Sequence, residues 1–383
     1  GGLFTSDPSA YCAAGKTGVA SGNSQYPYTV GDKDENAKPA HVDTATVPAK
    51  TTSNDDTVKN VASEITGANV TNNAAEAATK DLANKNKLTG DDQITVNGTT
   101  KTITEAVKEV TFDSSLTKDN VAIVYQTYVD VTVTDAKKNE TGVTEITVDL
   151  TPMYRVVATT KDVVKANQDI VVKGEESGNT QANAVVIEKG KKLTLPEAEY
   201  EIRLNVPNDF AAEINGQVSV KHTKDNGQVE YYTGTVIQEN GQAYVTFTTK
   251  GFSPFTISAP AASIGETMYP TLAEAIAKAA NGNIVNLEKS CTESVTVSGK
   301  SLTIDKKSHE YNFDKVTVDS NSTKTVSGDG KILTITYTAP SYSSGSSSYD
   351  PTYSVSTPSK TEHGTVTVSP KNASKGDRVT VTV

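Results

Sequence analysis

Four histidines offer the most recognisable chemistry in this sequence, because imidazole binds metals and exchanges protons near neutral pH. They are isolated from one another, with no H-E-x-x-H motif and no second histidine at ligand spacing. The four are His41, His222, His309 and His363. We therefore expect solvent-exposed or strand-surface positions, and we name no metal ligand and no cofactor-binding residue.

Nucleophile and nucleotide signatures are also missing from the sequence. There is no G-x-S-x-G elbow, no P-loop and no G-x-G-x-x-G fingerprint, which are the short motifs of hydrolases and nucleotide-binding folds. A Ser-His-Asp triad stays open as an alternative, because such triads assemble in space and not in sequence. No catalytic residue is predicted, and we expect that the chain is not an enzyme.

One acidic segment has part of the spacing of a calcium-binding EF-hand loop. Residues 32–36 read Asp-Lys-Asp-Glu-Asn, and Asp43 falls at the twelfth position of the loop. The sixth position is Ala37, where an EF-hand needs glycine, and Pro39 interrupts the segment. A solvated acidic linker is the favoured interpretation.

Lysine and asparagine on neighbouring strands could condense into an isopeptide crosslink, a chemistry that suits a threonine-rich surface stalk. Lys221 and Asn205 are one such pair of strand residues. No motif singles out a pair, so an ordinary exposed lysine is favoured over a crosslink.

The two cysteines, Cys12 and Cys291, lie far apart and outside any metal-binding spacing. We expect them to be unpaired rather than bridged, because they fall in different modules. The redox state of the protein's surroundings is therefore left open.

Composition narrows the fold and the partners. About 55 of the 383 residues are threonine, and branched side chains of this kind favour strands over helices. The formal charge of −10 argues against nucleic acid as a partner. Arginine occurs only at 155, 203 and 378, so bidentate recognition of phosphate or carboxylate is scarcely available. No apolar run is long enough to span a bilayer.

Period-2 patterns and turns predict strands from Val121 to Ile257. Asn226-Gly227 and Asn240-Gly241 lie between alternating runs, and Asn-Gly is the strongest short hairpin signal. We therefore predict an antiparallel β-sandwich. Before it, apolar residues recur at helical spacing between Thr57 and Ala83 and predict two short helices.

A single helix over Leu272–Ala280 is predicted next, with Thr271 as its N-cap and Glu274 three residues on. Short strands follow up to Tyr337, separated by small turns. A lone helix before short strands is typical of the capped end of a parallel β-solenoid. The chain starts without an initiator methionine and stops within an alternating Val-Thr pattern, so we expect further sequence at both ends.

Three passages resemble segments of large surface proteins of Gram-positive gut anaerobes that carry S-layer-homology anchors. Residues 1–30 resemble the closing segment of a pectate-lyase-like β-helix, and residues 269–305 resemble the opening of one. Residues 353–383 are similar to the internalin B-repeat-like domain, truncated after about half its length. The resemblance implies a multidomain, secreted cell-surface protein.

The predicted organisation combines these interpretations into a mainly β chain. It has an antiparallel β-sandwich, a short parallel β-solenoid-like module with a capping helix, and a small helical segment near the N-terminus. The predicted segments are a closing β-helix segment (1–30), a linker (31–56), a helical segment (57–90), the sandwich (91–260), the solenoid-like module (261–338), a Ser-rich linker (339–352) and the truncated repeat-like domain (353–383).

The solenoid resemblance also implies an enzymatic alternative, because polysaccharide lyases and glycoside hydrolases use that fold. Such sites need clustered carboxylates to bind Ca²⁺ or to act as acid and nucleophile. The candidates are Glu288, Glu293, Asp305, Glu310, Asp314 and Asp319. The region contains no arginine and few strands, which favours a non-catalytic interpretation.

The leading hypothesis is a non-catalytic segment of a bacterial cell-surface protein, outside the cell, that acts as an adhesin, a spacer or a surface-layer component. A carbohydrate-active module, either lyase-like or glycan-binding, is the alternative. Host glycans or host surface proteins are the expected partners of an adhesin, and self-assembly through open β edges is a further alternative.

Overall fold

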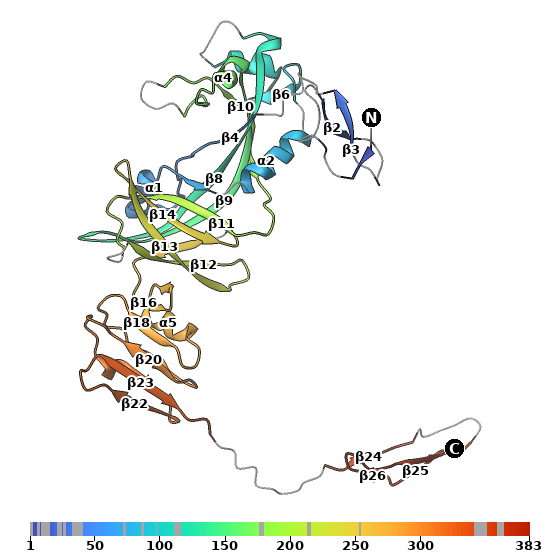
Figure 1. Ribbon diagram of the computed structural model, residues 1–383, viewed down its shortest axis with the longest axis vertical. Helices are drawn as coiled ribbons and strands as arrows, with labels where there is room; N and C mark the ends of the chain where they lie inside the picture. Colours follow the sequence, from blue (N-terminus) through green and yellow to red (C-terminus); the bar gives the residue numbers. More distant parts are fainter. Residues whose placement is uncertain are drawn as a thin grey trace. The chain divides into compact units, whose positions relative to one another are not determined.

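The computed structural model describes residues 3–5, 8, 16–20, 25, 28–32, 41–71, 74–85, 88–96, 98–110, 116–175, 180–212, 216–252, 254–340, 351–357 and 364–383. It divides into two compact units, Gly1–Thr336 and Tyr337–Val383. Strands dominate, and most of the strand pairs are antiparallel (Figure 1). The prediction of a mainly β chain is confirmed.

A closed β-barrel of eight strands forms the centre of the first unit. The strands are β5 (Ala68–Val70), β8 (Val121–Asn139), β9 (Gly142–Thr160), β11 (Tyr200–Val206), β12 (Gln217–Thr223), β13 (Val229–Glu239), β14 (Gln242–Thr249) and β15 (Phe255–Ser258). Their order round the ring is β9-β15-β12-β13-β14-β11-β5-β8, and β8 pairs back with β9. The ring leaves no free sheet edge among these strands.

The predicted β-sandwich over residues 91–260 is therefore wrong. An alternating strand buries one face whether two sheets pack against each other or one sheet closes on itself, so the pattern does not distinguish the two. Closure depends on β5, a strand of three residues that pairs with β11 on one side and with β8 at Ala68↔Val129 on the other. This strand lies before residue 91, inside the segment predicted to be helical.

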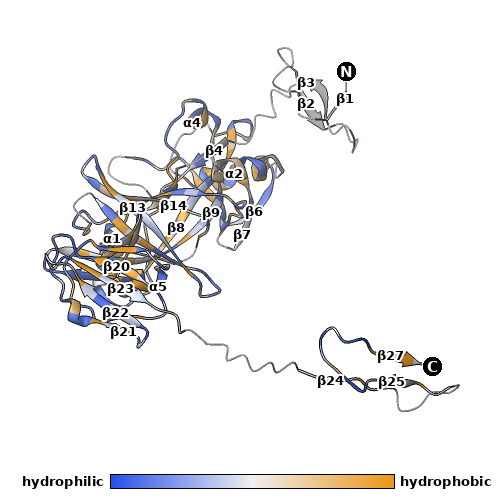
Figure 2. Ribbon diagram, turned by 60° about the horizontal axis from the view of Figure 1, so that its bottom comes forward, coloured by the Kyte–Doolittle hydropathy of each residue, from blue (hydrophilic) through white to orange (hydrophobic). Residues whose placement is uncertain are grey.

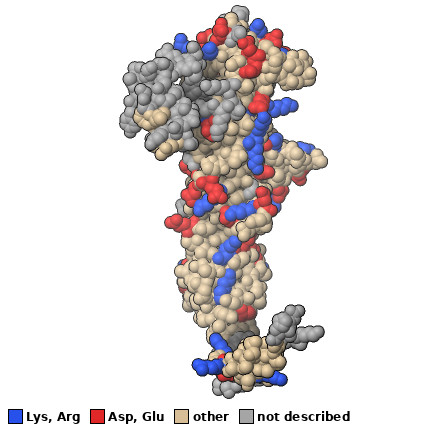
Figure 3. All heavy atoms as spheres, turned by 90° about the vertical axis from the view of Figure 1, so that its right-hand side faces the viewer, with Lys and Arg blue, Asp and Glu red and all other residues tan. Residues whose placement is uncertain are grey.

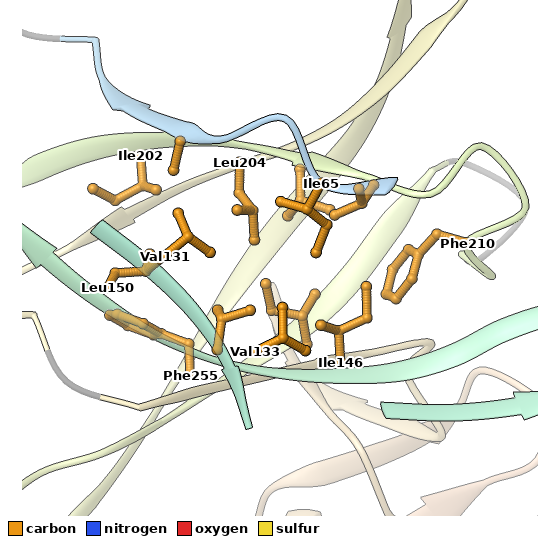
Figure 4. Close-up of a cluster of buried hydrophobic side chains, with 14 of the residues drawn as sticks. Ile65, Val131, Val133, Ile146, Leu150, Ile202, Leu204, Phe210 and Phe255 are labelled. Carbon is orange, nitrogen blue, oxygen red and sulfur yellow. The ribbon is translucent and has the colours of Figure 1, made fainter. Parts of the chain in front are cut away.

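Hydrophobic side chains fill the barrel (Figure 4). Alternate residues of its strands point inward, and the most deeply buried include Val133, Ile146, Leu150, Ile202, Leu204 and Ile257. Helix α1 (Asp56–Glu64) adds Val58, Val61 and Ala62 to this core. Asp55 caps α1, because its side chain accepts hydrogen bonds from the Thr57 and Val58 amides.

Strands β8 and β9 are 19 residues long and extend beyond the barrel. There β4 (His41–Thr44) pairs parallel with β8, and β10 (Val185–Lys192) pairs antiparallel with β9. One hydrophobic cluster on this extension includes residues of α2 (Ala74–Lys85) and α3 (Ile103–Lys108), and a second includes Val172 and Ala184. Nearby are α4 (Lys161–Lys165) and the hairpin of β6 (Gln93–Val96) and β7 (Thr99–Thr102). Helices α1 and α2 confirm the two helices expected near residues 57–83.

A mixed-sheet module follows the barrel. Its elements are β16 (Ala262–Ile264), β17 (Thr267–Tyr269), α5 (Leu272–Lys278), β18 (Ile284–Leu287), β19 (Val295–Val297), β20 (Leu302–Asp305), β21 (Val316–Val318), β22 (Ser322–Val326) and β23 (Ile332–Tyr337). Six strands form one sheet in the order β17-β16-β18-β20-β23-β22, and β19 pairs with β21 beside it. Figure 2 shows hydrophobic segments on β20 in this module and on β8 and β9.

The predicted parallel solenoid is wrong for this module, although the predicted helix is confirmed as α5. Only β18–β20 and β19–β21 pair in parallel, and the rest of the larger sheet is antiparallel where its register is given. The series of parallel strands ends at a tight turn after β22. In this turn the Ser327 hydroxyl accepts a hydrogen bond from the Ile332 amide, and Gly330 has a φ of +67°. This turn reverses β23, which then pairs antiparallel with β20.

The two ends of the chain contain small sheets. Near the start, β1 (Leu3–Phe4), β3 (Tyr28–Asp32) and β2 (Lys16–Ala20) form a three-stranded antiparallel sheet. In the second unit, β24 (Tyr353–Ser354) pairs with β26 (Asn372–Ala373), and β25 (Thr367–Ser369) pairs with β27 (Thr380–Thr382). Most of the predicted Ser-rich linker lies outside the described residues. Among the described helices, none is long and apolar enough to cross a membrane.

Replacing Leu204 by alanine tests the packed barrel. Its side chain is fully buried in the core, so we expect the Leu204→Ala variant to lose about 2–5 kcal/mol of unfolding free energy in urea. Ile284→Ala is the control, because the Ile284 side chain is 54% exposed and its loss should change stability by less than about 0.5 kcal/mol. Equal effects of the two changes would contradict the packed interior.

Candidate functional site

The histidines are not brought together in the part of the chain that the structure describes. His222 lies on barrel strand β12 with its ring buried, so the expected exposed or strand-surface position is wrong for this residue. His309 is in the mixed-sheet module. The side chain of His41 and the whole of His363 lie outside the described residues. Within those residues, no group of three or more histidine, cysteine or acidic side chains could hold a metal ion. The EF-hand-like segment is undescribed from residue 33 to 40, and Asp43 accepts a hydrogen bond from Gln126.

The carboxylates proposed for polysaccharide chemistry make separate local contacts. Glu293 accepts hydrogen bonds from the first two amides of α5, with both N···O distances at 3.1 Å. Glu288 accepts from Ser263 and Lys307, and Asp319 accepts from the Gly299 amide at 2.6 Å.

The remaining three candidates have different surroundings again. Asp305 accepts from the Lys307 amide, while Glu310 and Asp314 are exposed. Three of the six carboxylates, Glu293, Asp305 and Asp319, thus cap turns or a helix of the module, and the structure does not gather the six into one cluster.

Lys221 and Asn205 are also apart. The Lys221 amine lies 2.6 Å from a carboxylate oxygen of Glu274. Asn205 is buried, accepts from the Thr66 amide and donates to the Ala243 carbonyl. Their strands β12 and β11 are separated in the ring by β13 and β14. The example pair for an isopeptide crosslink is therefore wrong.

Arg155 makes a bidentate contact, which the scarcity of arginine had argued against. Its guanidinium donates to both carboxylate oxygens of Glu175, at 2.6 and 2.8 Å, and through Nε to Gln126 at 2.9 Å. Gln126 in turn donates to Asp43. This network ties β4 and the segment near residue 175 to the hairpin of β8 and β9.

Cys291 is a free, half-buried thiol, and burial raises its pKa. Cys12 lies outside the described residues.

A groove of about 540 Å³ lies beside α2. It is lined by one stripe of α2, by residues of the segment 192–196 and by Tyr154. Small apolar side chains of the helix, Ala74, Ala77 and Ala78, make up most of one wall. Small residues alone do not specify a ligand, so the groove does not define a site.

The junction between the barrel and the mixed-sheet module concentrates polar contacts. Strand β17 lies against the outer face of β12 and β13, where Ser219 and Thr233 are directly opposite each other. The Thr233 hydroxyl accepts from the Met268 amide at 3.1 Å and donates to the Glu266 carbonyl at 2.6 Å. The Ser219 hydroxyl donates to the Met268 carbonyl at 3.0 Å. An edge strand exposes unpaired amides and carbonyls, and these two hydroxyls satisfy those of Met268.

The next cross-strand pair on the same face, Lys221 and Tyr231, binds helix α5. One carboxylate oxygen of Glu274 accepts from the Lys221 amine at 2.6 Å and from the Tyr231 hydroxyl at 3.0 Å. The other oxygen accepts from Thr271, the N-cap of α5. Burial and the nearby Glu274 carboxylate raise the pKa of Tyr231, so its hydroxyl remains a donor at neutral pH.

Aromatic packing and a second lysine complete this junction. The rings of Tyr231 and Tyr269 are 4.8 Å apart between centroids. Lys278, in the last turn of α5, donates to the Val229 carbonyl at 3.0 Å. The sequence offered only a weak signal for this arrangement, namely the Thr271/Glu274 helix cap, because the partners on β12 and β13 depend on strand register.

Acidic and basic side chains are interspersed over the face of the molecule in Figure 3. Ion pairs join several of them, including Lys137 with Glu145 and Lys138 with Asp209.

Comparison with protein-family models, with curated proteins and with solved structures gives no match for this chain.

Replacing Thr233 by valine tests the docking of β17. Valine keeps the shape of threonine but leaves the buried Met268 amide without its acceptor, which should cost about 1–3 kcal/mol of unfolding free energy. Thr235→Val is the matched control, because Thr235 is exposed two residues further along the same face of β13. Urea unfolding would contradict the docking if both variants matched the parent protein.

Proposed function

We propose that this chain is a non-catalytic spacer within a secreted bacterial cell-surface protein. The observation that supports it best is the junction, where two successive cross-strand pairs bind the adjoining module through hydroxyl, amine and aromatic contacts. Contacts of several kinds at one interface restrict rotation between modules. A spacer needs this property, because its role is to hold neighbouring parts of a protein at a set separation.

The packing of the barrel supports the same proposal. Its interior is filled by side chains of the barrel strands and of α1, so the barrel contributes a folded body of fixed width. In the adjoining module, carboxylates that could have served catalysis stabilise turns and the start of α5 instead. These are roles in stability and shape.

The location at a bacterial surface rests on the sequence resemblance to surface proteins of Gram-positive gut anaerobes. Adhesin and surface-layer roles belong to the same proposal and differ from a plain spacer in having a partner. For self-assembly through β edges, the edge of β21 is a poor candidate, because the Lys324 amine donates to the Val316 carbonyl at 2.7 Å. A lysine placed on a strand edge hinders pairing with another chain.

Distances between spin labels on the barrel and on the adjoining module test the spacer directly. Glu201 and Lys331 are exposed positions on the two sides and can be changed to cysteine after Cys12 and Cys291 are replaced by serine. We expect one narrow distance distribution by double electron–electron resonance at neutral pH. A broad distribution in this parent protein would overturn the proposal.

Two tyrosine variants of the labelled protein test whether the junction is what keeps the distance between the two modules narrow. Tyr231→Ala removes the ring contact with Tyr269 and the hydrogen bond to Glu274, so the distribution should broaden. Tyr244→Ala is the control, because Tyr244 lies on the neighbouring strand β14 and stacks on Arg203 of another barrel strand, β11. Broadening by both variants would assign the rigidity to barrel stability and not to the junction.

Binding and turnover assays separate the related functions. Specific binding to a host glycan or host protein would make the segment an adhesin. Depolymerisation of a polysaccharide, with or without Ca²⁺, that is lost in Asp305→Asn would replace the spacer by a carbohydrate-active enzyme. We expect neither activity from the described modules.

A further inference from the structure

A buried histidine lies inside the barrel wall that carries the junction. His222 is 2% exposed and stacks on Phe255 with ring centroids 4.6 Å apart. It is on β12, between Lys221 and Thr223, and is directly opposite Glu230 on β13. Its Nδ1 atom lies 3.7 Å from a carboxylate oxygen of Glu230.

The charged groups around this imidazole already bind one another. Glu230 accepts hydrogen bonds from the Lys224 amine and from the Tyr232 hydroxyl. Asp225 lies in the turn between β12 and β13, and the loop after β14 packs near the ring at Gly251. In that loop Lys250 pairs with Glu199 at 3.6 Å. Strand β15 contributes only the uncharged Phe255 ring.

Three consecutive residues of β13 connect the imidazole to the junction. The Val229 carbonyl accepts from Lys278 of α5, Glu230 lies beside His222, and the Tyr231 hydroxyl donates to Glu274. Glu230 is a partly exposed residue at the end of the ribbon, with its side chain 38% exposed. Its two chain neighbours contact α5, Val229 through its backbone carbonyl and Tyr231 through its side chain, so a shift of the strand at Glu230 moves both contacts. The end of the β12–β13 ribbon therefore forms part of the His222 surroundings and part of the junction.

We propose that His222 is a proton-sensitive latch, whose protonation loosens the end of the β12–β13 ribbon and releases the mixed-sheet module from the barrel. The proposal rests on the spacer function, since it adds regulation to the same junction. A charged imidazole competes with Lys224 for the Glu230 carboxylate, and it carries its charge into a site lined by Phe255. Both effects favour an opened ribbon in which the imidazole meets water.

The direction of the pH dependence follows from burial. Desolvation lowers the pKa of His222 in the closed form, with Glu230 opposing that effect. In the open form the imidazole has its ordinary pKa of about 6.5. The closed junction is therefore fully stable above that pH and loses stability as the pH falls through the folded value, because the open form binds the proton more readily.

Spin-label distances between positions 201 and 331 test the latch at about pH 7.5 and about pH 5, on either side of the ordinary histidine pKa. We expect a single narrow distance at the higher pH and loss of that narrow distance at the lower pH. A narrow distribution at both values overturns the latch and leaves the spacer intact. A broad distribution at both values overturns the spacer itself.

Substitution of the histidine identifies the group that responds. His222→Phe keeps an aromatic ring beside Phe255 and removes the titrating nitrogen, so the narrow distance should persist at the lower pH. His222→Gln provides a second non-titrating side chain if the phenylalanine variant does not fold. His309→Gln in the mixed-sheet module is the matched control and should respond to pH as the parent does. A pH response that survives in a folded His222 variant assigns proton sensing to another group and contradicts the latch.

Discussion

The register between β12 and β13 determines which of their side chains face the barrel core and which face the mixed-sheet module. Val218 and Val220 point into the core, while Ser219 and Lys221 point toward the adjoining module. A slip of one residue would exchange these faces, because side chains alternate along a strand. It would place hydroxyl and amine groups in the core and remove the partners of β17 and α5 in the same step.

Gly234 contributes to holding that register. It lies opposite Val218 on β13, and a Cβ atom at this position would come within 2.9 Å of the Val218 side chain and 3.1 Å of Val245. Glycine lets the two strands and β14 pack closely at this point. The same ribbon then presents Ser219 with Thr233, and Lys221 with Tyr231, as adjacent pairs on its outer face. The junction is thus a consequence of how the barrel packs.

Much of the secondary structure could be predicted from the sequence, and the way in which it closes could not. Alternating patterns and Asn-Gly turns located most strands between Val121 and Ile257, and the Thr271 cap located α5. Closure depends on β5, whose three residues Ala68–Val70 carry too little pattern to identify a strand. The parallel pairs β18–β20 and β19–β21 resemble a solenoid locally, but a tight turn at Gly330 ends the series. Beyond the Thr271/Glu274 cap, the junction could not be predicted from the sequence, because its contacts join residues about 33 to 53 positions apart.

Hydrogen exchange at the Met268 amide tests the central claim most directly. This amide lies on an edge strand and has no strand partner on its outer side, so its protection depends on the Thr233 hydroxyl of the barrel. If the module is docked as described, the Met268 amide should exchange as slowly as amides of the central barrel strands. Exchange at the rate of an exposed edge amide, while the barrel amides stay protected, would contradict a fixed junction.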